Sequence, residues 1–142
     1  MLEAMDERRR LYEAYQPTFW RRSPKASDAQ ATFFRTLIST DNAIVLVAED
    51  ASIFRGFVIA TLIDSPPVYA PGGKTCVIDD FAVTQNDWDE TGRALLGEAD
   101  RLARAAGAVQ GVVVCAHLDE AKRNFLRSEG FSIASEWFVR NF

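Results

Sequence analysis

The sequence is poor in the residues that bind metals and form disulfides. Its 142 residues include one histidine, His117, and two cysteines, Cys76 and Cys115. No CxxC motif or cysteine-histidine spacing of a zinc site is found near either cysteine. The sequence therefore predicts no metal site, and buried structural thiols are the simpler interpretation of both cysteines. His117 is either a hydrogen-bonded histidine at a strand end or a residue at the rim of an active site.

Long hydrophobic runs are also missing. No apolar run approaches the roughly 20 residues of a membrane-spanning helix, and the N-terminus, MLEAMDERRR, lacks the apolar core of a secretory signal. We therefore expect a cytoplasmic protein without membrane contact. The net charge of −4 and the lack of a basic-aromatic stripe argue against nucleic-acid binding. Arg8–Arg10 and Arg21–Arg22 make the first segment locally basic, but such runs are most often solvated faces.

Proline and glycine are scarce outside one stretch. Ser65 to Gly73 (SPPVYAPGG) contains three of the five prolines and two of the eight glycines, which predicts a surface loop. A chain of 142 residues suits one domain that buries roughly 70% of its unfolded surface. With 48% hydrophobic and 25% charged residues, the composition is that of an ordinary globular protein. We predict a single domain over residues 1–142.

Hydrophobic periodicity predicts four elements in the first half of the chain. Apolar residues at helical spacing indicate two helices, and two runs rich in β-branched residues indicate the strands of a hairpin. These elements are a helix from Leu2 to about Tyr15, a helix from Asp28 to Ser39, and the strands Ala43–Glu49 and Ile53–Ile63, joined by Asp50–Ser52.

The centre of the chain predicts a buried strand followed by an amphipathic helix. Thr75–Val83 has few polar positions apart from Asp79 and Asp80, as expected of a central strand covered on both faces. Strand alternation places these two acids on opposite faces, so only one of them should face a cleft. A helix follows over Thr91–Ala106, and Gly107 supplies a left-handed stop.

The last third predicts a strand, a helix and a final strand. Val109–His117 is a continuous apolar run, typical of a strand buried on both faces. A helix runs from Asp119, its N-cap, to about Glu129, with Ala121, Phe125 and Leu126 facing inward. Ile133–Phe142 forms the last strand. The whole order indicates a mixed α/β (α+β) domain with helices on both faces of a central mixed sheet, antiparallel in its N-terminal half.

Three motifs stand within this order of elements: IDDFAV (Ile78–Val83), GRALL (Gly92–Leu96) and FLRSEGF (Phe125–Phe131). Together with the order of elements, they resemble the GNAT N-acetyltransferase superfamily over nearly the whole chain. IDDFAV (Ile78–Val83) is similar to the family's acid-bearing strand, and FLRSEGF (Phe125–Phe131) to its closing FYEKxGF. GRALL (Gly92–Leu96) is similar to the end of its Arg/Gln-x-x-Gly-x-Gly/Ala loop. The resemblance implies a GNAT-like fold in which the family's first strand is apparently missing, so that either the chain starts late or the sheet lacks an edge. The sheet edge left unpaired favours a homodimer.

The resemblance also implies an activity and a set of site residues. GNAT enzymes transfer an acetyl group from acetyl-CoA to an amine, here the amine of a small molecule, and Asp79 stands at the position of the general base. In the family, strand backbone holds pantetheine and the thioester, and a loop at a helix N-terminus holds the pyrophosphate. The implied cofactor-binding residues are Phe81, Ala82 and Val83 on the strand, Thr91, Gly92, Arg93 and Ala94 at the helix start, and Asp119 at the start of the last helix.

Departures from the family pattern leave a second function open. Glu90 replaces a glycine of the pyrophosphate loop, and together with Asp87 and Asp89 it brings three carboxylates to a helix N-terminus, where they would repel a diphosphate. Leu126 replaces the proton-donating tyrosine. The alternative is a non-catalytic GNAT-fold binding or regulatory module with weak or no CoA binding. In that case Asp79 and its neighbour would pair with a buried arginine or cap a loop.

Overall fold

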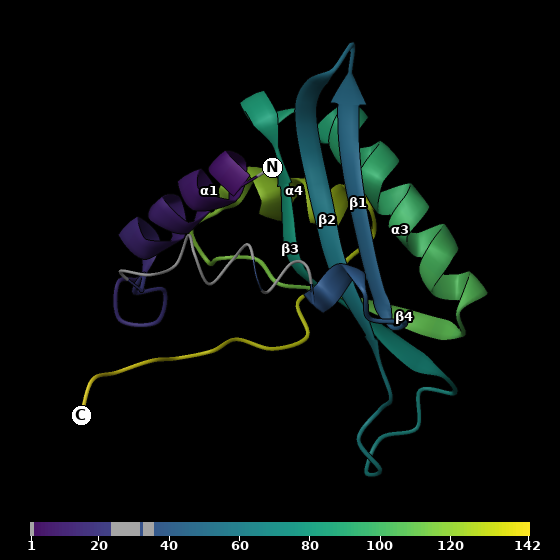
Figure 1. Cartoon of the computed structure of the whole chain (residues 1–142). Coiled ribbons are helices and arrows are strands. Elements are labelled where there is room, and N and C mark those ends of the chain that lie inside the picture. Colours follow the sequence, from purple (N-terminus) through teal and green to yellow (C-terminus); the bar gives the residue numbers. More distant parts are fainter. Residues whose placement is uncertain (1, 24–31, 33–35) are drawn as a thin grey trace.

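The computed structural model describes residues 2–23, 32 and 36–142, in which four strands form one mixed sheet. The strands lie in the order β1 (Ala43–Asp50), β2 (Ile53–Ile63), β3 (Lys74–Val83) and β4 (Ala108–Val113). β1, β2 and β3 pair antiparallel, and β4 joins β3 in parallel. The prediction of a central strand is confirmed, because β3 has a hydrogen-bonded neighbour on each side (Figure 1).

Helices cover both faces of the sheet, as predicted. α1 (Leu2–Tyr15) lies on one side of the sheet, and α3 (Arg93–Ala105) lies on the other (Figure 1). A small core under α1 contains Met5, Phe57 and Ile59. The larger core lies under α3 and α4 (Glu120–Ser128) and includes Ile44, Val58, Ala60, Leu62, Cys76, Ile78, Phe81, Leu95, Leu96, Ala99, Ala103, Phe125 and Leu126. Burial of each large side chain of this set stabilises the fold by roughly 1.5–3 kcal/mol.

α3 begins with an irregular turn. Trp88–Gly92 forms a π-helical turn, and regular α-helix begins at Arg93 rather than at the predicted Thr91. Of the apolar residues in this predicted amphipathic helix, Leu95, Leu96, Ala99 and Ala103 are buried, whereas Ala94 and Ala106 are exposed. Gly107 has φ of 89°, so the predicted left-handed stop is confirmed.

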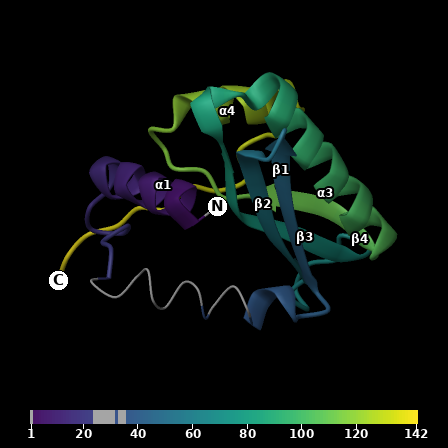
Figure 2. The ribbon, with the colours of Figure 1, turned by 45° about the horizontal axis from the view of Figure 1, so that its top comes forward.

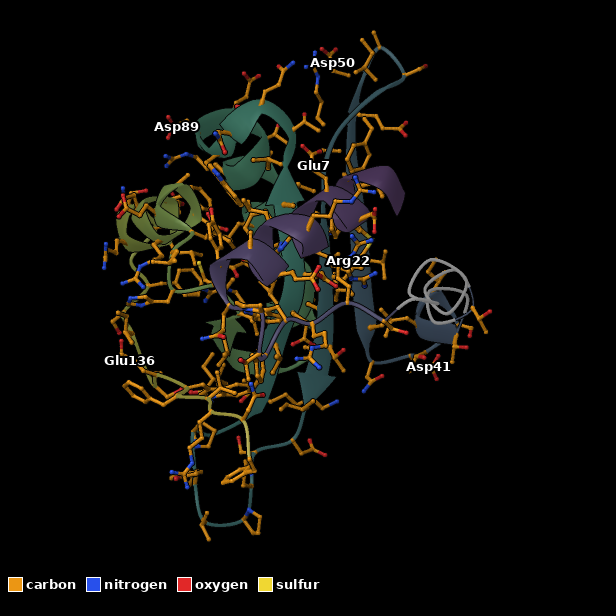
Figure 3. All side chains as sticks on the ribbon, turned by 90° about the vertical axis from the view of Figure 1, so that its left-hand side faces the viewer. Glu7, Arg22, Asp41, Asp50, Asp89 and Glu136 are labelled. Carbon is orange, nitrogen blue, oxygen red and sulfur yellow. The ribbon has the colours of Figure 1, made fainter. Side chains whose placement is uncertain are left out.

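The two predicted connections around β2 are also confirmed. Ala51 and Ser52 both have positive φ, 48° and 69°, which suits the tight two-residue turn between β1 and β2. Asp50 marks this tip of the hairpin in Figure 3. At the other end of β2, Val68 and Tyr69 are exposed in the predicted surface loop.

The predicted strand Val109–His117 is wrong in length and in burial. β4 ends at Val113, and most of its residues are exposed, including Val109 and Val112. β4 is an edge strand of the described sheet, with β3 as its one described neighbour, and α3 packs against it. A continuous apolar run therefore does not distinguish an edge strand from a fully covered one.

The predicted last strand is also wrong. Residues 131–142 contain no strand, and the segment runs away from the sheet toward the side on which α1 lies (Figures 1 and 2). Trp137 is 78% exposed and Phe138 is 93% exposed, and a ring contact of 5.8 Å joins Trp137 to Phe19. A β-rich pattern requires a partner strand, and no described strand pairs with this segment.

The predicted helix Asp28–Ser39 lies largely outside the described residues, although residues 32 and 36–38 are helical. Among the residues that the structure describes, no helix combines the length and the apolar character needed to cross a lipid bilayer. The first described element is α1, and β1 lies at the sheet edge with no described strand beyond it.

Candidate functional site

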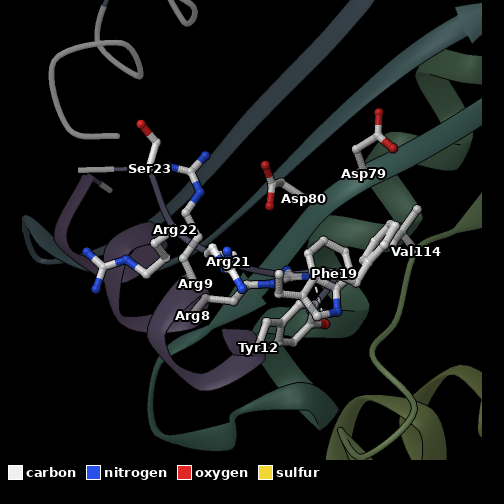
Figure 4. Close-up of a pocket in the computed structure, with 11 residues that line it drawn as sticks. Arg8, Arg9, Tyr12, Phe19, Arg21, Arg22, Ser23, Asp79, Asp80 and Val114 are labelled. Carbon is white, nitrogen blue, oxygen red and sulfur yellow. Dashed lines mark hydrogen bonds between the residues drawn. The ribbon is translucent and has the colours of Figure 1, made fainter. Parts of the chain in front are cut away.

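Asp79 and Asp80 lie at a break in the pairing of β3 with β2. Ile59 pairs with Asp80, and the next residue, Ala60, pairs with Ile78, so that Asp79 is an extra residue in β3. Such a bulge interrupts the alternation of side chains between the two faces of a sheet. Both carboxylates consequently line the same cleft (Figure 4). The prediction that only one of them could face a cleft is wrong.

This cleft has a volume of about 370 Å³ and lies between β3 and the N-terminal part of the chain. The other residues that line it come from α1, from the segment that follows α1, and from the segment after β4. They are Arg8, Arg9, Tyr12, Phe19, Trp20, Arg21, Arg22, Ser23 and Val114. The volume falls in the range of small-molecule sites, roughly 300–1,000 Å³.

The environment of Asp79 makes its carboxylate a stronger base. Partial loss of solvent in the cleft raises the pKa of Asp79, and the negative charge of Asp80 raises it further. Neither carboxylate forms an ion pair or a hydrogen bond with any residue that the structure describes. The alternative that these acids pair with a buried arginine therefore does not describe this structure.

β3 and β4 separate next to the two acids. Their pairing stops at Ile78, whose carbonyl oxygen accepts the last backbone hydrogen bond, from the N–H of Val114 at 2.9 Å. Beyond that point no described strand pairs with β3 on this side, while its other side stays paired with β2. The segment expected to hold pantetheine and the thioester, Phe81–Val83, lies in this half-paired stretch.

The side chain of Lys122 on α4 bridges the separated strands. Its Nζ donates hydrogen bonds to the carbonyl oxygens of Phe81, at 3.1 Å, and Val114, at 2.9 Å. Lys122 is 0% exposed, and its pKa is lowered well below the usual value, first because burial disfavours the charged form and second because the Arg8 guanidinium repels it. Arg8 donates a hydrogen bond to the same Phe81 carbonyl. Two basic side chains therefore occupy the gap between the strands.

The sequence does not single out Lys122. The prediction that Ala121 faces inward is wrong, because Ala121 is exposed and Lys122 is buried in its place. The available signal is spacing, since Lys122 stands three and four residues before the buried Phe125 and Leu126 and thus on the same helix face. Lysines are so rarely buried that this spacing alone seldom justifies the assignment.

Tyr12 connects α1 to the start of α4. Its hydroxyl donates to Asp119 Oδ2 at 3.2 Å and accepts hydrogen bonds from Arg8 Nη2 at 2.9 Å and from the N–H of Ala116 at 3.3 Å. Burial raises the pKa of Tyr12, so that the hydroxyl keeps its proton. Asp119 caps α4, as predicted, by accepting a hydrogen bond from the N–H of Lys122. The carboxylate of this predicted cofactor-binding residue is thus engaged within the protein.

The turn before α3 is capped by its own carboxylate. Asp87 Oδ2 accepts a hydrogen bond from the Thr91 hydroxyl at 2.6 Å, and Oδ1 accepts one from the N–H of Glu90 at 3.4 Å. The bond from Thr91 is the main cause that lowers the pKa of Asp87. The N–H of Gly92 donates to the Asp87 carbonyl oxygen at 3.0 Å. Donors that could hold an anion at this helix start are therefore partly occupied.

The missing side chain of Gly92 makes room for an indole ring. A Cβ atom at Gly92 would lie 3.0 Å from Cε3 of Trp88. The Trp88 ring stacks on Phe125, with centroids 5.3 Å apart, and meets the ring of Phe81 edge-on at 5.1 Å. Gly92 therefore allows the turn to pack on the core, a role that the loop motif alone does not reveal.

The other two predicted loop residues, Arg93 and Ala94, are exposed on the first turn of α3. Arg93 Nη1 forms an ion pair with Glu129 Oε1 at 2.9 Å, and its Nε donates to the carbonyl oxygen of Asp89 at 3.2 Å. The guanidinium of Arg93 is thus engaged by groups of the chain itself.

The sequence also does not single out the basic wall of the cleft, which consists of Arg8, Arg9, Arg21 and Arg22. The basic runs Arg8–Arg10 and Arg21–Arg22 are predicted to be solvated faces, yet four of their five arginines line the cleft. The signal lies in α1, where Arg8 is three residues after Met5 and four before Tyr12, and both of these neighbours are buried. A charged residue on the buried face of an amphipathic helix is a candidate for a site.

Comparison with known proteins identifies the fold. No protein-family model and no curated protein matches the sequence. Among solved structures, the BH1408 protein from Bacillus halodurans matches with a TM-score of 0.82 at 14% identity, over 99% of this chain and 90% of its own. The aminoglycoside N-acetyltransferase AAC(6')-Iy, solved in complex with CoA, matches with a TM-score of 0.71 at 12% identity, over 99% and 89%.

A further match, with a TM-score of 0.66 and 20% identity, is a protein from Pyrococcus furiosus described as an acetyl transferase, over 99% of this chain and 95% of its own. The chain has the GNAT fold. Within this GNAT fold, β3 brings Asp79 and Asp80 into the cleft and carries Phe81–Val83 beyond them. Thr91, Gly92, Arg93 and Ala94 lie at the start of α3 and do not line the cleft.

Proposed function

We propose that this protein transfers the acetyl group of acetyl-CoA to the amine of a small molecule, with Asp79 as the general base. The observation that supports this most is the position of Asp79. Its carboxylate has a raised pKa, forms no ion pair with a described residue, and lies in a cleft of small-molecule size. The cleft adjoins the stretch of β3 that pairs with no described strand on its β4 side. The acetyltransferase neighbours, one of them solved with CoA, support the same reaction class.

In the proposed reaction, the amine nitrogen attacks the carbonyl carbon of the thioester. A C–N bond forms, and the tetrahedral intermediate then collapses with cleavage of the C–S bond. Asp79 accepts the proton that the amine loses, which requires the ionised carboxylate. The departing CoA thiolate takes up one proton. Leu126, at the position of the family's tyrosine, is buried and has no proton to donate, so the proton comes from water or from another acid near the cleft.

A binding or regulatory module is the second candidate function. Two features favour it. The Asp87 carboxylate occupies donors at the start of α3 that could otherwise hold a phosphate, and the side chains of Lys122 and Arg8 occupy the Phe81 carbonyl oxygen between β3 and β4. Thermal unfolding with and without CoA separates the two candidates. A ligand present at 100 times its Kd stabilises a protein by about 2.7 kcal/mol, whereas a module that does not bind CoA shows no shift.

The direct test is thiol release from acetyl-CoA by the wild-type protein in the presence of a panel of small amines. We expect amine-dependent release of CoA and formation of the N-acetyl product, identified by mass spectrometry. Release without any amine would indicate hydrolysis of the thioester instead. If the protein shows neither thiol release nor thermal stabilisation by CoA, the results favour the binding module.

A further inference from the structure

The candidate cleft is lined by side chains of opposite charge, and no ion pair joins them among the described residues. The carboxylates of Asp79 and Asp80 come from β3, and the arginine side chains come from α1 and the segment after it (Figure 4). No arginine that the structure describes lies within ion-pair distance of either carboxylate. The two carboxylates therefore remain available to a ligand.

Two of the arginines have no carboxylate partner among the described residues. Among the described residues, the hydrogen-bond acceptors of Arg8 are a backbone carbonyl and a tyrosine hydroxyl, both neutral. Arg21 is exposed at the cleft and takes part in no ion pair with a described residue. Arg22, by contrast, is paired with Asp6 at 2.5 Å, beside α1 (Figure 3). The basic wall therefore keeps positive charge that an anionic group of a ligand would meet.

Aromatic rings form the apolar part of the same cleft. Phe19 meets Trp20 edge-on with centroids 4.7 Å apart, and Trp20 contacts Tyr12 at 5.2 Å. Rings that pack on one another in this way form a surface with few internal degrees of freedom, which suits an apolar ligand body. The volume of about 370 Å³ limits the ligand to a small molecule.

We infer that the acceptor is a small amino carboxylate with an apolar body, whose amine binds at Asp79 and Asp80 and whose carboxylate binds at Arg8 and Arg21. This inference rests on the proposed acetyl transfer, for which it names the substrate class. Guanidinium groups bind carboxylates with paired, charge-assisted hydrogen bonds. A polycationic amine is disfavoured, because its second positive charge would meet the arginine wall.

The test compares ligands that differ in one group. L-Phenylalanine, phenethylamine (the same body without the carboxylate) and spermidine are titrated calorimetrically into the full-length protein without acetyl-CoA. We expect phenylalanine to bind at least about tenfold more tightly than phenethylamine. Arg21→Gln, an exposed position at which folding should be retained, should remove most of this difference and leave the affinity for phenethylamine unchanged. Arg127→Gln, an exposed arginine on α4 outside the cleft, is the control.

Equal affinities for phenylalanine and phenethylamine, tighter binding of spermidine, or no binding of phenylalanine would overturn the inference. Turnover separates this failure from failure of the proposed reaction. If the protein acetylates phenethylamine or spermidine but not phenylalanine, acetyl transfer stands and the substrate class is wrong. If phenylalanine binds with the expected dependence on Arg21 but no amine is acetylated, the class of ligand is right and acetyl transfer is wrong.

Discussion

Asp80 is the neighbour that tunes Asp79, because the bulge in β3 keeps the two carboxylates in one cleft. The charge of Asp80 raises the pKa of Asp79, so Asp80→Asn should lower that pKa. A general base is active when deprotonated, and activity therefore falls as the pH drops through its pKa. We predict that Asp80→Asn moves the acidic limb of the kcat/KM profile to lower pH. Asp64→Asn, at an exposed acid outside the cleft, should leave the limb in place. An unmoved or raised limb in Asp80→Asn would contradict the coupling.

Lys122 should make the stability of the protein depend on pH above neutrality. Its pKa in the folded state lies below that of the unfolded chain, so the unfolded state binds more protons between these two values. Stability contributed by Lys122 is therefore lowest at low pH and rises with pH through this window. We predict that wild type gains stability relative to Lys122→Met as the pH is raised from 7 toward 10, measured by urea unfolding. The exposed Lys74→Met should show no such trend, and a parallel pH dependence of wild type and Lys122→Met would refute the assignment.

At the scale of elements, we expect the turn before α3 to control how tightly a phosphate group of CoA binds. Asp87 places a negative charge on the N–H groups that would otherwise meet the ligand. Asp87→Asn keeps an oxygen acceptor for the cap but removes the charge. We predict that this change tightens binding of CoA about two- to fivefold, as expected for one charge at a helix N-terminus.

The matched control for the turn is Asp89→Asn, an exposed acid two residues away whose side chain forms no hydrogen bond with a described residue. Calorimetric titration with CoA compares the three proteins. If Asp89→Asn gains as much as Asp87→Asn, general charge and not the cap controls the affinity. If neither variant gains, the phosphates do not approach this turn.

Local patterns predicted the central elements well because their causes are local. The apolar run of β3 and the periodic stripe of α3 each report burial within one element, and the stop at Gly107 depends on one residue. The bulge at Asp79 and the end of β4 at Val113 depend instead on how separate segments are paired. No residue of β3 alone reveals the extra position opposite β2, and this was the cause of the error about Asp80.

The residues of the candidate site also divide into one that a local motif reveals and others that depend on how separate segments pack. Asp79 could be named from the resemblance of its strand to a family motif. Arg8, Tyr12 and Lys122 could not, because they reach the site from helices far from β3 in the sequence. Their convergence on the Phe81 carbonyl and the start of α4 becomes visible only when α1 and α4 are placed on the sheet.

On the scale of the whole molecule, the C-terminal segment and the sheet edges bear on self-association. Trp137 and Phe138 are exposed, and β4 presents Val109 and Val112 at an unpaired edge. Exposed apolar groups and open strand edges are typical of surfaces that bind another chain. The homodimer therefore stays a prediction, to be measured by size-exclusion chromatography with light scattering.

Deletion of residues 132–142 should convert the dimer to a monomer if this segment forms the contact. A Val68→Ser/Tyr69→Ser variant, which removes two equally exposed apolar side chains in the loop after β2, is the control and should stay dimeric. A wild-type protein that is monomeric at all concentrations would refute the prediction.

The central claim is that Asp79 removes the proton of an amine that attacks acetyl-CoA. The most direct test is kcat/KM for acetylation by wild type, Asp79→Asn and the control Asp64→Asn, with the Kd for CoA measured on all three. We predict a loss of at least about 100-fold in Asp79→Asn with an unchanged Kd for CoA, and no loss in Asp64→Asn. A wild-type rate retained by Asp79→Asn would contradict the account.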